Sequence, residues 1–242
     1  MTDRIANTIE RLRAAGVDNP RLDARLLTTE ERIARRIARE PVAYILGHKG
    51  FWTLDIQVGP GALIPRPETE TLIEQLLKHV PDRTAPLDIL DLGTGTGCLI
   101  AAAMSEYPNA RGTGIDASEQ ALAWARKNSH ANLVLGDFAE IDGTYDVILS
   151  NPPYVRTQDI ANLAPEVRLY EPVEALDGGP DGLDAYRALG PVIRRVLKPG
   201  ALAFLEIGAG QGMEVSAITG LEILGIAPDL AGIERCVVGR KS

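Results

Sequence analysis

The amino-acid sequence predicts an α/β protein, in which a parallel sheet covered by helices follows a small helical module. Three observations lead to this prediction. From residue 87 to residue 238, short apolar runs typical of buried strands alternate with helical stretches, which is the pattern of a parallel sheet. The first forty residues carry apolar side chains at helical spacing. A strictly alternating segment, residues 54–58, lies between these two parts.

Length and composition indicate an ordinary globular protein. The 242 residues fit one large domain, or a full domain that carries a smaller one. With 45% hydrophobic and 24% charged residues, the composition excludes a largely disordered, collagen-like or disulfide-rich chain. No apolar run approaches the roughly 18 residues of a membrane span, and no signal-peptide stretch is present at the N-terminus. We expect a cytoplasmic protein without membrane contact, whose Cys98 and Cys236 are reduced thiols.

Charge is distributed unevenly along the chain. The net charge of −8 argues against a protein that binds nucleic-acid backbones with its whole surface, since such binding relies on Lys and Arg. Residues 1–40 differ, because nine Arg and seven Asp or Glu give them +2 and leave −10 for the remainder. This front part is either a solvated helical face of mixed sign or a docking surface for a partner with acidic patches.

Residues 1–47 form the predicted helical domain. Apolar side chains recur at helical spacing in three stretches, which Gly16 and the pair Asn19 and Pro20 separate. The stretches are Ile5, Ile9 and Leu12, then Leu22, Leu26 and Leu27, then Ile33 and Ile37. We expect them to form a small module of helices.

Residues 48–65 are predicted to be a β-hairpin that links the two domains. Strict alternation over residues 54–58 indicates a strand, the Gly-Pro-Gly segment 59–61 a turn, and residues 62–64 a second strand. A helix is expected from about Glu68, with an apolar face at residues 72, 73, 76, 77 and 80, and Pro81 ends it.

Residues 66–242 contain the alternating elements. Strands are predicted at residues 87–92, 112–115, 133–135, 146–150, 202–207 and 236–238. Helices are predicted after Gly97, across residues 122–128, over residues 184–197 and after Gly210. In an open parallel sheet, ligands bind at the carboxyl ends of the strands. Residues that directly follow a strand are therefore the candidates for a functional site.

A glycine-rich loop follows the first of these strands. It reads Asp91, Leu92, Gly93, Thr94, Gly95, Thr96 and Gly97. Glycines at the point where a buried strand turns into a helix let the backbone approach a ligand closely, which predicts a cofactor site. The spacing is Gly-x-Gly-x-Gly, and Cys98 stands where the dinucleotide fingerprint would have its last small residue. NAD is therefore not the expected cofactor.

Acidic and aromatic residues end the next two strands. Asp116, nineteen residues after Gly97, can accept hydrogen bonds from both hydroxyls of a ribose, or else cap the helix that follows. Asp137 suits an adenine amino group and Phe138 suits the face of that ring; a helix cap and core packing are the alternatives. Together these strand ends fit S-adenosylmethionine, a nucleoside with a short zwitterionic tail, and they look like the binding motifs of the Rossmann-like methyltransferases.

The fourth strand runs into the tetrapeptide Asn151, Pro152, Pro153 and Tyr154. Two prolines fix their φ angles and remove two backbone donors, so the turn offers carbonyl oxygens without competing amides. The Asn151 amide oxygen and the Pro152 carbonyl can both accept from one NH2 group, and Tyr154 offers an aromatic face to a planar substrate. An ordinary turn that begins with Asn-Pro is the alternative, but the position after a strand of this sheet favours a catalytic role.

An acceptor wall of this kind suits transfer to a conjugated NH2 group. Such a group is a poor nucleophile, because its lone pair is delocalised, and holding its two hydrogens directs the lone pair toward an electrophile. The acceptors also bind better as the nitrogen gains positive charge. No metal and no strong general base are expected, and we assign His48, His79 and His130, which lie outside the strand ends, to surface or linker roles.

Several stretches carry a resemblance to known proteins. The tetrapeptide resembles motif IV of amino methyltransferases, which include adenine and cytosine N-methyltransferases and glutamine methyltransferases. The further stretches are Leu63-Ile64-Pro65-Arg66-Pro67-Glu68-Thr69-Glu70, Tyr170-Glu171-Pro172, Ala175-Leu176-Asp177-Gly178-Gly179, Asp181-Gly182-Leu183 and Asp229-Leu230-Ala231-Gly232. This combination resembles the release factor glutamine methyltransferase family, also called HemK or PrmC, from about residue 20 to the C-terminus.

The resemblance implies a doubly wound Rossmann-like methyltransferase sheet and a reaction. The implied reaction is N5-methylation of the glutamine in the Gly-Gly-Gln loop of peptide chain release factors, with S-adenosylmethionine as donor and S-adenosylhomocysteine as product. Residues 93–97, Asp116, Phe138 and Asn151 match the cofactor positions of the family, and residues 151–154 match its substrate-binding tetrapeptide. Phe138 departs in type, since the family often has Trp there, but either ring can stack.

The resemblance also assigns roles outside these motifs. Arg66, Pro67 and Glu68 are expected to help form the substrate pocket; a helix start, with prolines first and acids near the N-terminal dipole, is the alternative. Residues 1–47 become the substrate-docking domain, and residues 66–242 the methyltransferase domain of a protein expected to be a monomer. Between Leu27 and Thr28 the chain lacks a helical stretch that the family usually has.

Other functions fit the motifs less well. A glutamine methyltransferase that acts on a ribosomal protein shares the tetrapeptide and stays open as the main alternative. A nucleic-acid adenine N6-methyltransferase is disfavoured, because the bulk of the chain is acidic and no basic, aromatic-bearing recognition segment is present. A cofactor-binding module without catalysis is disfavoured by the intact tetrapeptide, and a nicotinamide-dependent oxidoreductase by the glycine spacing.

Overall fold

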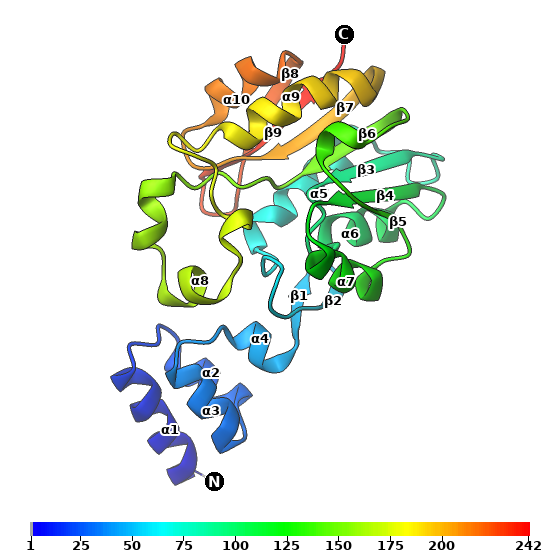
Figure 1. The fold of residues 1–242 in the computed structure, drawn as a ribbon. Coiled ribbons are helices and arrows are strands. Elements are labelled where there is room, and N and C mark those ends of the chain that lie inside the picture. Colours follow the sequence, from blue (N-terminus) through cyan, green and yellow to red (C-terminus); the bar gives the residue numbers. More distant parts are fainter. Residues whose placement is uncertain (1) are drawn as a thin grey trace.

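The computed structural model describes residues 2–242, which form a layered α/β unit with a helical module at its N-terminal end (Figure 1). The module contains α1 (Thr2–Ala14), α2 (Pro20–Leu26), α3 (Glu30–Ile37) and α4 (Val42–Leu46), and the strands β1 (His48–Phe51) and β2 (Leu54–Gln57) follow it. The strands of the large sheet are β3 (Asp88–Leu92), β4 (Arg111–Asp116), β5 (Asn132–Leu135), β6 (Tyr145–Ser150), β7 (Leu197–Glu206), β8 (Glu222–Pro228) and β9 (Glu234–Arg240). The helices of this unit are α5 (Glu70–His79), α6 (Cys98–Glu106), α7 (Glu119–Asn128), α8 (Pro165–Tyr170), α9 (Asp184–Val196) and α10 (Gly212–Thr219). Short 3-10 turns are η1 (Pro67–Thr69), η2 (Phe138–Glu140), η3 (Thr157–Asn162) and η4 (Val173–Ala175).

The large sheet has the order β5-β4-β3-β6-β7-β9-β8. The strands β3 to β7 are parallel, and β9 runs antiparallel between β7 and β8. The chain moves outward from β3 to β5 and then returns to β6 on the other side of β3, which makes a topological switch point. Leu92 pairs with Ser150 across this point, so the glycine loop and the tetrapeptide leave the sheet side by side.

Helices cover both faces of the sheet because its central strands are apolar on both sides. In β6, Val147 and Leu149 pack with Leu72 of α5 and with α6, whereas Ile148 faces Leu189 of α9 on the opposite side. Figure 1 shows α5, α6 and α7 on one face and α9 and α10 on the other. The predicted doubly wound α/β fold is therefore confirmed.

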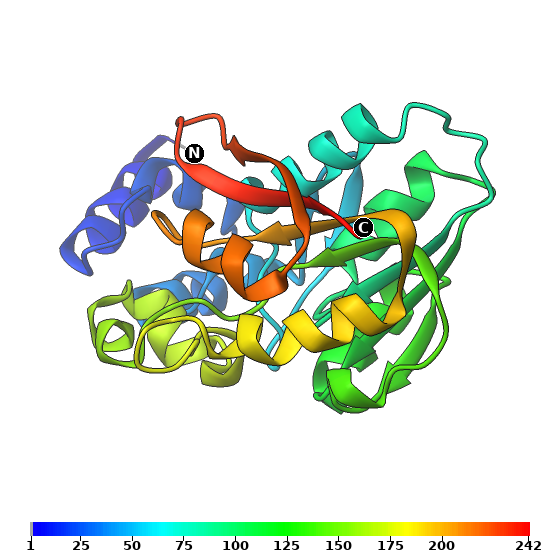
Figure 2. The same ribbon diagram turned by 90° about the horizontal axis from the view of Figure 1, so that it is seen from above.

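The helical module has small apolar cores of its own, and ion pairs join it to α8. Arg36, 7% exposed, contacts Asp23 at 2.7 Å and Glu166 of α8 at 2.8 Å, and Arg39 contacts Glu166 at 2.7 Å. The Tyr170 hydroxyl donates to a backbone carbonyl just after α3 at 2.6 Å. Both views show α8 beside the module (Figures 1 and 2). Arg36 and Arg39, two arginines of the basic segment 1–40, thus form ion pairs within the protein.

The hairpin differs from the predicted one. The structure pairs β2 with β1, residues 48–51, and not with residues 62–64. The turn lies at Trp52, whose φ is +54°. The Gly-Pro-Gly segment serves packing instead, because a Cβ on Gly59 would lie 2.3 Å from the Trp124 ring of α7, and one on Gly61 would lie 2.5 Å from Gln120. Gly59 and Gly61 are therefore needed because α7 packs closely against them. The sequence pattern does not distinguish such close packing from a turn.

The edge strand β8 was not predicted, and the inner strand β7 is longer than predicted. Strand β8 is interrupted by bulges near Gly225 and Pro228, and its side chains are only partly buried, so it lacks a clear apolar alternation. The predicted strand 202–207 begins earlier, at Leu197, and turns through Pro199 and Gly200. In residues 2–242, no helix combines the length and the apolar character that crossing a membrane requires.

Candidate active site

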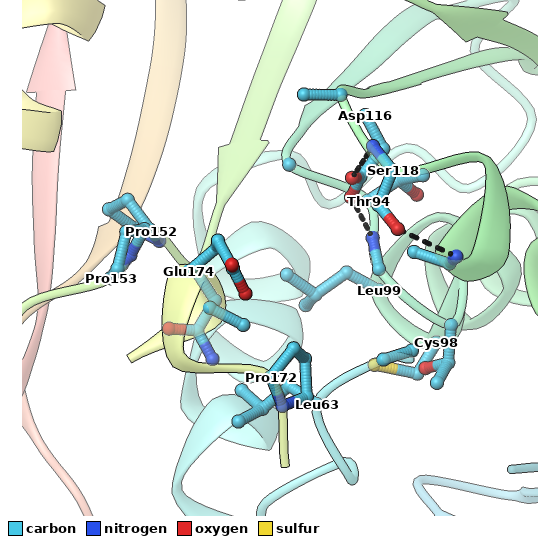
Figure 3. Close-up of a pocket in the computed structure, with 18 of the residues that line it drawn as sticks. Leu63, Thr94, Cys98, Leu99, Asp116, Ser118, Pro152, Pro153, Pro172 and Glu174 are labelled. Carbon is cyan, nitrogen blue, oxygen red and sulfur yellow. Dashed lines mark hydrogen bonds between the residues drawn. The ribbon is translucent and has the colours of Figure 1, made fainter. Parts of the chain in front are cut away.

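A cavity of about 610 Å3 opens at the carboxyl ends of the central strands, beside the switch point (Figure 3). Of the predicted site residues, its wall contains Arg66, Gly93, Thr94, Gly95, Thr96, Asp116, Phe138, Asn151, Pro152 and Pro153. The predicted residues Pro67, Glu68, Gly97, Asp137 and Tyr154 lie outside this wall. Segments that are far apart in the sequence therefore meet at one site.

The glycine loop bends back over the end of β4. Gly93, Gly95 and Gly97 have φ angles of +74°, +56° and +77°, a left-handed conformation that favours glycine. The Gly93 amide donates to the Ile115 carbonyl at 2.9 Å. A Cβ on Gly93 or Gly95 would have no neighbour closer than 3.6 Å, whereas one on Gly97 would meet Ala125 at 3.1 Å. The first two glycines leave backbone open toward the cavity, and the third lets α6 pack on α7.

Asp116 connects the loop to the start of α7. Its Oδ2 accepts from the Gly95 amide at 2.8 Å and its Oδ1 from the Ser118 amide at 2.9 Å (Figure 3). Burial raises the pKa of Asp116, and these two backbone bonds oppose that rise. Ser118, and not Asp116, is the N-cap of α7. Each carboxylate oxygen has further lone pairs, so Asp116 can still accept hydrogen bonds from hydroxyls in the cavity.

Phe138 and Asp137 separate in the structure. Phe138 lines the cavity and also packs against the core under α9. The Asp137 carboxylate accepts from the Ala139 amide at 2.8 Å, and Glu140 completes a capping box with it. Phe138 therefore lies where its ring can face a ligand in the cavity. Asp137 caps η2 instead, which was the alternative role predicted for it.

The tetrapeptide presents oxygen atoms to the cavity. The Asn151 amide nitrogen donates to the hydroxyl of Thr69, a buried residue of η1, at 3.0 Å. Because Nδ2 is engaged there, Oδ1 is the end of the amide that is available to a ligand. Pro152 and Pro153 line the same wall, and the Ser150 hydroxyl ties β6 to the Leu92 carbonyl of β3 at 2.7 Å.

Tyr154 does not line the cavity. Its hydroxyl donates at 3.2 Å to Oε1 of Glu206, which stands at the end of β7 and is fully buried. Burial raises the pKa of Glu206 to about 7. The sequence predicted an aromatic face at Tyr154 for the substrate, and the geometry gives this side chain a bond to an unpredicted carboxyl instead.

A second unpredicted carboxyl lies beneath the glycine loop. Asp91 is fully buried at the end of β3, and its Oδ2 accepts from the Thr94 hydroxyl at 2.7 Å. Its Oδ1 has no hydrogen-bond partner among the described residues. Burial raises the pKa of Asp91 to about 7. Sequence offered a signal for this residue, an acid among the apolar residues at the buried end of β3, but no role.

Arg66 reaches the cavity, whereas Pro67 and Glu68, which follow it, do not. Arg66 contacts Glu171 at 2.5 Å, and the Ile64 amide donates to the same buried carboxylate at 3.0 Å. Glu171 therefore ties the segment before α5 to the segment after α8. Pro67 and Glu68 begin η1, which agrees with the alternative that they start a helix.

The remaining wall adds little reactive chemistry. Cys98 and Glu174 line the cavity, and burial raises the pKa of the Cys98 thiol to about 12. Both cysteines are free thiols. Among residues 2–242, no three His, Cys, Asp or Glu side chains are grouped as a metal site would require.

The wall is divided into two sides. Figure 3 shows Pro152 and Pro153 across the cavity from Asp116 and Ser118. The Asp116 side offers open glycine backbone, a carboxylate and the Phe138 ring, which suit a nucleoside with a charged tail. The Asn151 side offers amide and carbonyl oxygens, which suit a donor NH2 group.

Comparisons with known proteins identify a methyltransferase domain in this part of the chain. The family model described as "Methyltransferase small domain" matches residues 68–177, the part that holds the glycine loop, Asp116 and the tetrapeptide. A solved methyltransferase structure from Pyrococcus furiosus superimposes with a TM-score of 0.58 at 21% identity, covering 88% of this chain and 100% of that one. At this identity the likeness shows the fold alone.

Two curated relatives are similar over almost the whole chain. The release factor glutamine methyltransferase of Caulobacter vibrioides is 42% identical over 271 aligned residues, covering 96% of this chain and 93% of the relative. That of Rhodospirillum rubrum is 41% identical and covers 96% of this chain and 82% of the relative. The first alignment is longer than this 242-residue chain, so it includes positions that this chain lacks. With this identity and coverage, the chain belongs to the release factor glutamine methyltransferase family.

Proposed function

We propose that this protein methylates the N5 atom of the glutamine side chain in the Gly-Gly-Gln loop of peptide chain release factors. The observation that carries the proposal is the acceptor wall at Asn151 and Pro152, which shares one cavity with the glycine loop and Asp116. A carboxamide NH2 has two N–H donors and no acidic proton, and this wall offers two oxygen acceptors for it.

S-adenosylmethionine is the methyl donor, and the residues present fit it. Asp116 is a carboxylate beside an open glycine backbone, Phe138 supplies an aromatic ring, and both residues line the same cavity. When bound, the donor supplies an electrophilic methyl group on a sulfonium. Asp116 would hold the ribose hydroxyls, and the amides of the loop would face the charged tail.

The protein contributes positioning to the reaction. Oδ1 of Asn151 and the Pro152 carbonyl would hold the two hydrogens of the substrate amide, which turns the nitrogen lone pair toward the methyl group. These oxygens interact more strongly as positive charge grows on the nitrogen, so they favour the transition state over the ground state. The Thr69 bond keeps the Asn151 amide in the required orientation.

The proposal also covers the partner that the enzyme binds and the cellular compartment in which the enzyme works. We propose that residues 1–47 dock the substrate, that the protein is a monomer and that it does not bind nucleic acid. The bulk negative charge outside residues 1–40 supports a protein substrate over a nucleic acid. We infer that the enzyme works in the cytoplasm, where release factors act.

The test is transfer of a labelled methyl group from S-adenosylmethionine to an intact release factor. A release factor whose loop glutamine is replaced serves as the parallel substrate. We expect label on the first protein and none on the second. Equal labelling of both would reject the site, and labelling of ribosomal proteins alone would move the assignment to that substrate class.

A further inference from the structure

Glu171 is a buried carboxyl beside the cavity that the proposed reaction does not yet use. Its side chain is 1% exposed. Oε1 accepts from Nη2 of Arg66 at 2.5 Å, and Oε2 accepts from the Ile64 amide, 107 residues earlier in the sequence, at 3.0 Å. Figure 3 shows Leu63 and Pro172, the neighbours of the bonded residues, side by side in the cavity wall. Both oxygens of the carboxyl therefore bind the segment that precedes η1.

The carboxyl is also held firmly from its own side. Glu171 directly follows α8, and its amide donates to the Val167 carbonyl of that helix at 2.9 Å. The helical module holds both ends of α8, because the Tyr170 hydroxyl donates to the Ala38 carbonyl at 2.6 Å and Glu166 pairs with two arginines of the module. A carboxyl fixed in this way can set the position of the segment that it binds.

Arg66 is the side chain that this carboxyl holds at the cavity. Among residues 2–242, it is the only Lys, Arg or His in the cavity wall, and its side chain is 30% exposed. A guanidinium carries several N–H donors in a planar fork. Within the described part of the chain, Glu171 is the only group that accepts from them. The other donors of Arg66 are therefore available to a ligand.

Hydrogen bonds connect Arg66 to the acceptor wall. The Arg66 carbonyl accepts from the Thr69 amide at 3.1 Å. The Thr69 hydroxyl accepts from Nδ2 of Asn151 at 3.0 Å. Arg66 and Asn151 thus belong to one hydrogen-bonded unit, and both line the cavity. This connection assigns Arg66 to the side of the cavity that would meet the substrate amide.

We propose that Glu171 is a positioning residue for the protein substrate: it holds the Arg66 guanidinium so that the free N–H groups donate to backbone carbonyl oxygens of the release-factor loop. The inference rests on the proposed function and adds two residues to it. Asn151 and Pro152 offer acceptors, whereas a peptide loop also brings carbonyl oxygens that need donors. The glycines of a Gly-Gly-Gln loop have no side chains to cover those oxygens, and Arg66 supplies donors at the same wall.

The carboxyl matters because an arginine side chain is long and flexible. A free Arg66 side chain would sample many rotamers, and the substrate would have to order it on binding. The bond to Glu171 orders the guanidinium before the substrate arrives. The pair also has no net charge, so Arg66 can stand in the cavity without strongly repelling the sulfonium of S-adenosylmethionine.

The experiment measures methyl transfer by full-length wild type and Glu171→Gln, with intact release factor and S-adenosylmethionine. Glutamine keeps a carbonyl oxygen for the Ile64 amide but has no negative charge to hold Arg66. We expect KM for the release factor to rise about 10-fold, which is what a hydrogen bond to a charged group contributes. The kcat at saturating release factor and the calorimetric Kd for S-adenosylmethionine should stay unchanged.

Glu106→Gln is the matched control. Glu106 is also a partly buried carboxyl that binds an arginine, Arg83, and accepts from an N–H group, the Trp52 indole, at 2.6 Å. It lies outside the cavity wall, so its variant should keep the wild-type KM for the release factor.

A double-mutant cycle tests whether Glu171 acts through Arg66. Arg66→Met alone should raise KM for the release factor at least as much as Glu171→Gln does, and Glu171→Gln should add almost nothing in the Arg66→Met background. A merely structural role of Glu171 would instead lower kcat in both backgrounds. Should Glu171→Gln fail to fold, Arg66→Met gives the same comparison of KM for the release factor with Kd for S-adenosylmethionine.

Two results would overturn the inference. One is an additive cost of the two substitutions in KM for the release factor. The other is a weaker Kd for S-adenosylmethionine with an unchanged KM for the release factor, which would assign Arg66 to the carboxylate of the cofactor. Absence of transfer by the wild type would instead reject the proposed function.

Discussion

In the proposed mechanism, Asn151 acts through its amide oxygen, because its nitrogen is engaged by Thr69. Asn151→Ala removes an acceptor that is used mainly at the transferring nitrogen, so we expect turnover to fall about 100-fold. Affinity for S-adenosylmethionine should change far less. Steady-state kinetics and calorimetry measure the two quantities. Asn132, which is exposed at the start of β5 and lies outside the cavity wall, offers a matched control as Asn132→Ala, and near-normal turnover of Asn151→Ala would reject the acceptor mechanism.

Asp91 should make stability depend on pH. Burial raises its folded-state pKa to about 7, above its usual value of about 3.9. Between these values the folded state holds a proton that the unfolded state releases, so this carboxyl lowers the free energy of unfolding as pH rises from about 4 to 7. Asp91→Asn cannot ionise and should gain stability relative to wild type over that range. Urea unfolding at pH 5 and pH 8 measures the difference, and a constant difference at both values would contradict the assignment.

Sequence predicted single residues best where a backbone constraint dictates the residue type. The left-handed φ angles of Gly93 and Gly95 require glycine, and the position of Asp116 at a strand end follows from sheet geometry. The direction in which a side chain points was harder to predict from the sequence. Whether Asp137 faces a ligand or caps η2, and whether Tyr154 faces the cavity or Glu206, depends on rotations that no spacing rule encodes. The aromatic-face role of Tyr154 stays a prediction.

At the scale of elements, ion pairs from Arg36 of α3 and from Arg39, just after it, to Glu166 of α8 join the helical module to the α/β unit. Burial would raise the pKa of Glu166, but hydrogen bonds from Arg39 and Arg36 outweigh it and keep the pKa below its usual range. Glu166→Ala would leave two largely buried guanidinium groups short of a partner. We expect it to lower the free energy of unfolding by on the order of 3 kcal/mol and to raise KM for the release factor more than KM for S-adenosylmethionine.

A surface ion pair of the same module provides the control. Glu30 is 71% exposed in its pair with Arg11, so Glu30→Ala should change the free energy of unfolding by less than about 1 kcal/mol. Chemical denaturation and steady-state kinetics with intact release factor measure both variants. If Glu166→Ala left KM for the release factor unchanged, the ion pairs would hold the fold together without serving the substrate.

Elements were predictable where apolar side chains recur with a clean period. Helix α5 and the central strands β3 and β6 follow that rule, since they are buried on the expected faces. Short or edge elements were not predictable. Strand β1 has Lys49 where an alternating pattern would need an apolar residue, two positions before the buried Phe51, and α8 covers only Pro165–Tyr170. Helix α8 is held by Arg36 and Arg39, which are remote in sequence and which a local pattern does not contain.

At the scale of the whole molecule, the cavity lies at the switch point, where the strand order reverses between β3 and β6. Its walls come from the segment before α5, the loops after β3, β4 and β5, and the tetrapeptide after β6. A ligand bound there contacts segments from both sides of the switch point. It therefore stabilises the folded chain as a whole, because unfolding of either half would destroy the site.

S-adenosylmethionine should accordingly raise the melting temperature of the entire α/β unit. At one hundred times its Kd, a ligand that binds only the folded state adds about 2.7 kcal/mol, or about 5–10 °C for a chain of this length. Asp116→Ala should shrink this shift by weakening cofactor binding, because it removes the carboxylate beside Gly95. NAD should produce no comparable shift, since the loop has Cys98 in place of the last small residue of the dinucleotide fingerprint. Thermal scans with each ligand measure these effects, and equal stabilisation by NAD would contradict the assignment of the cavity.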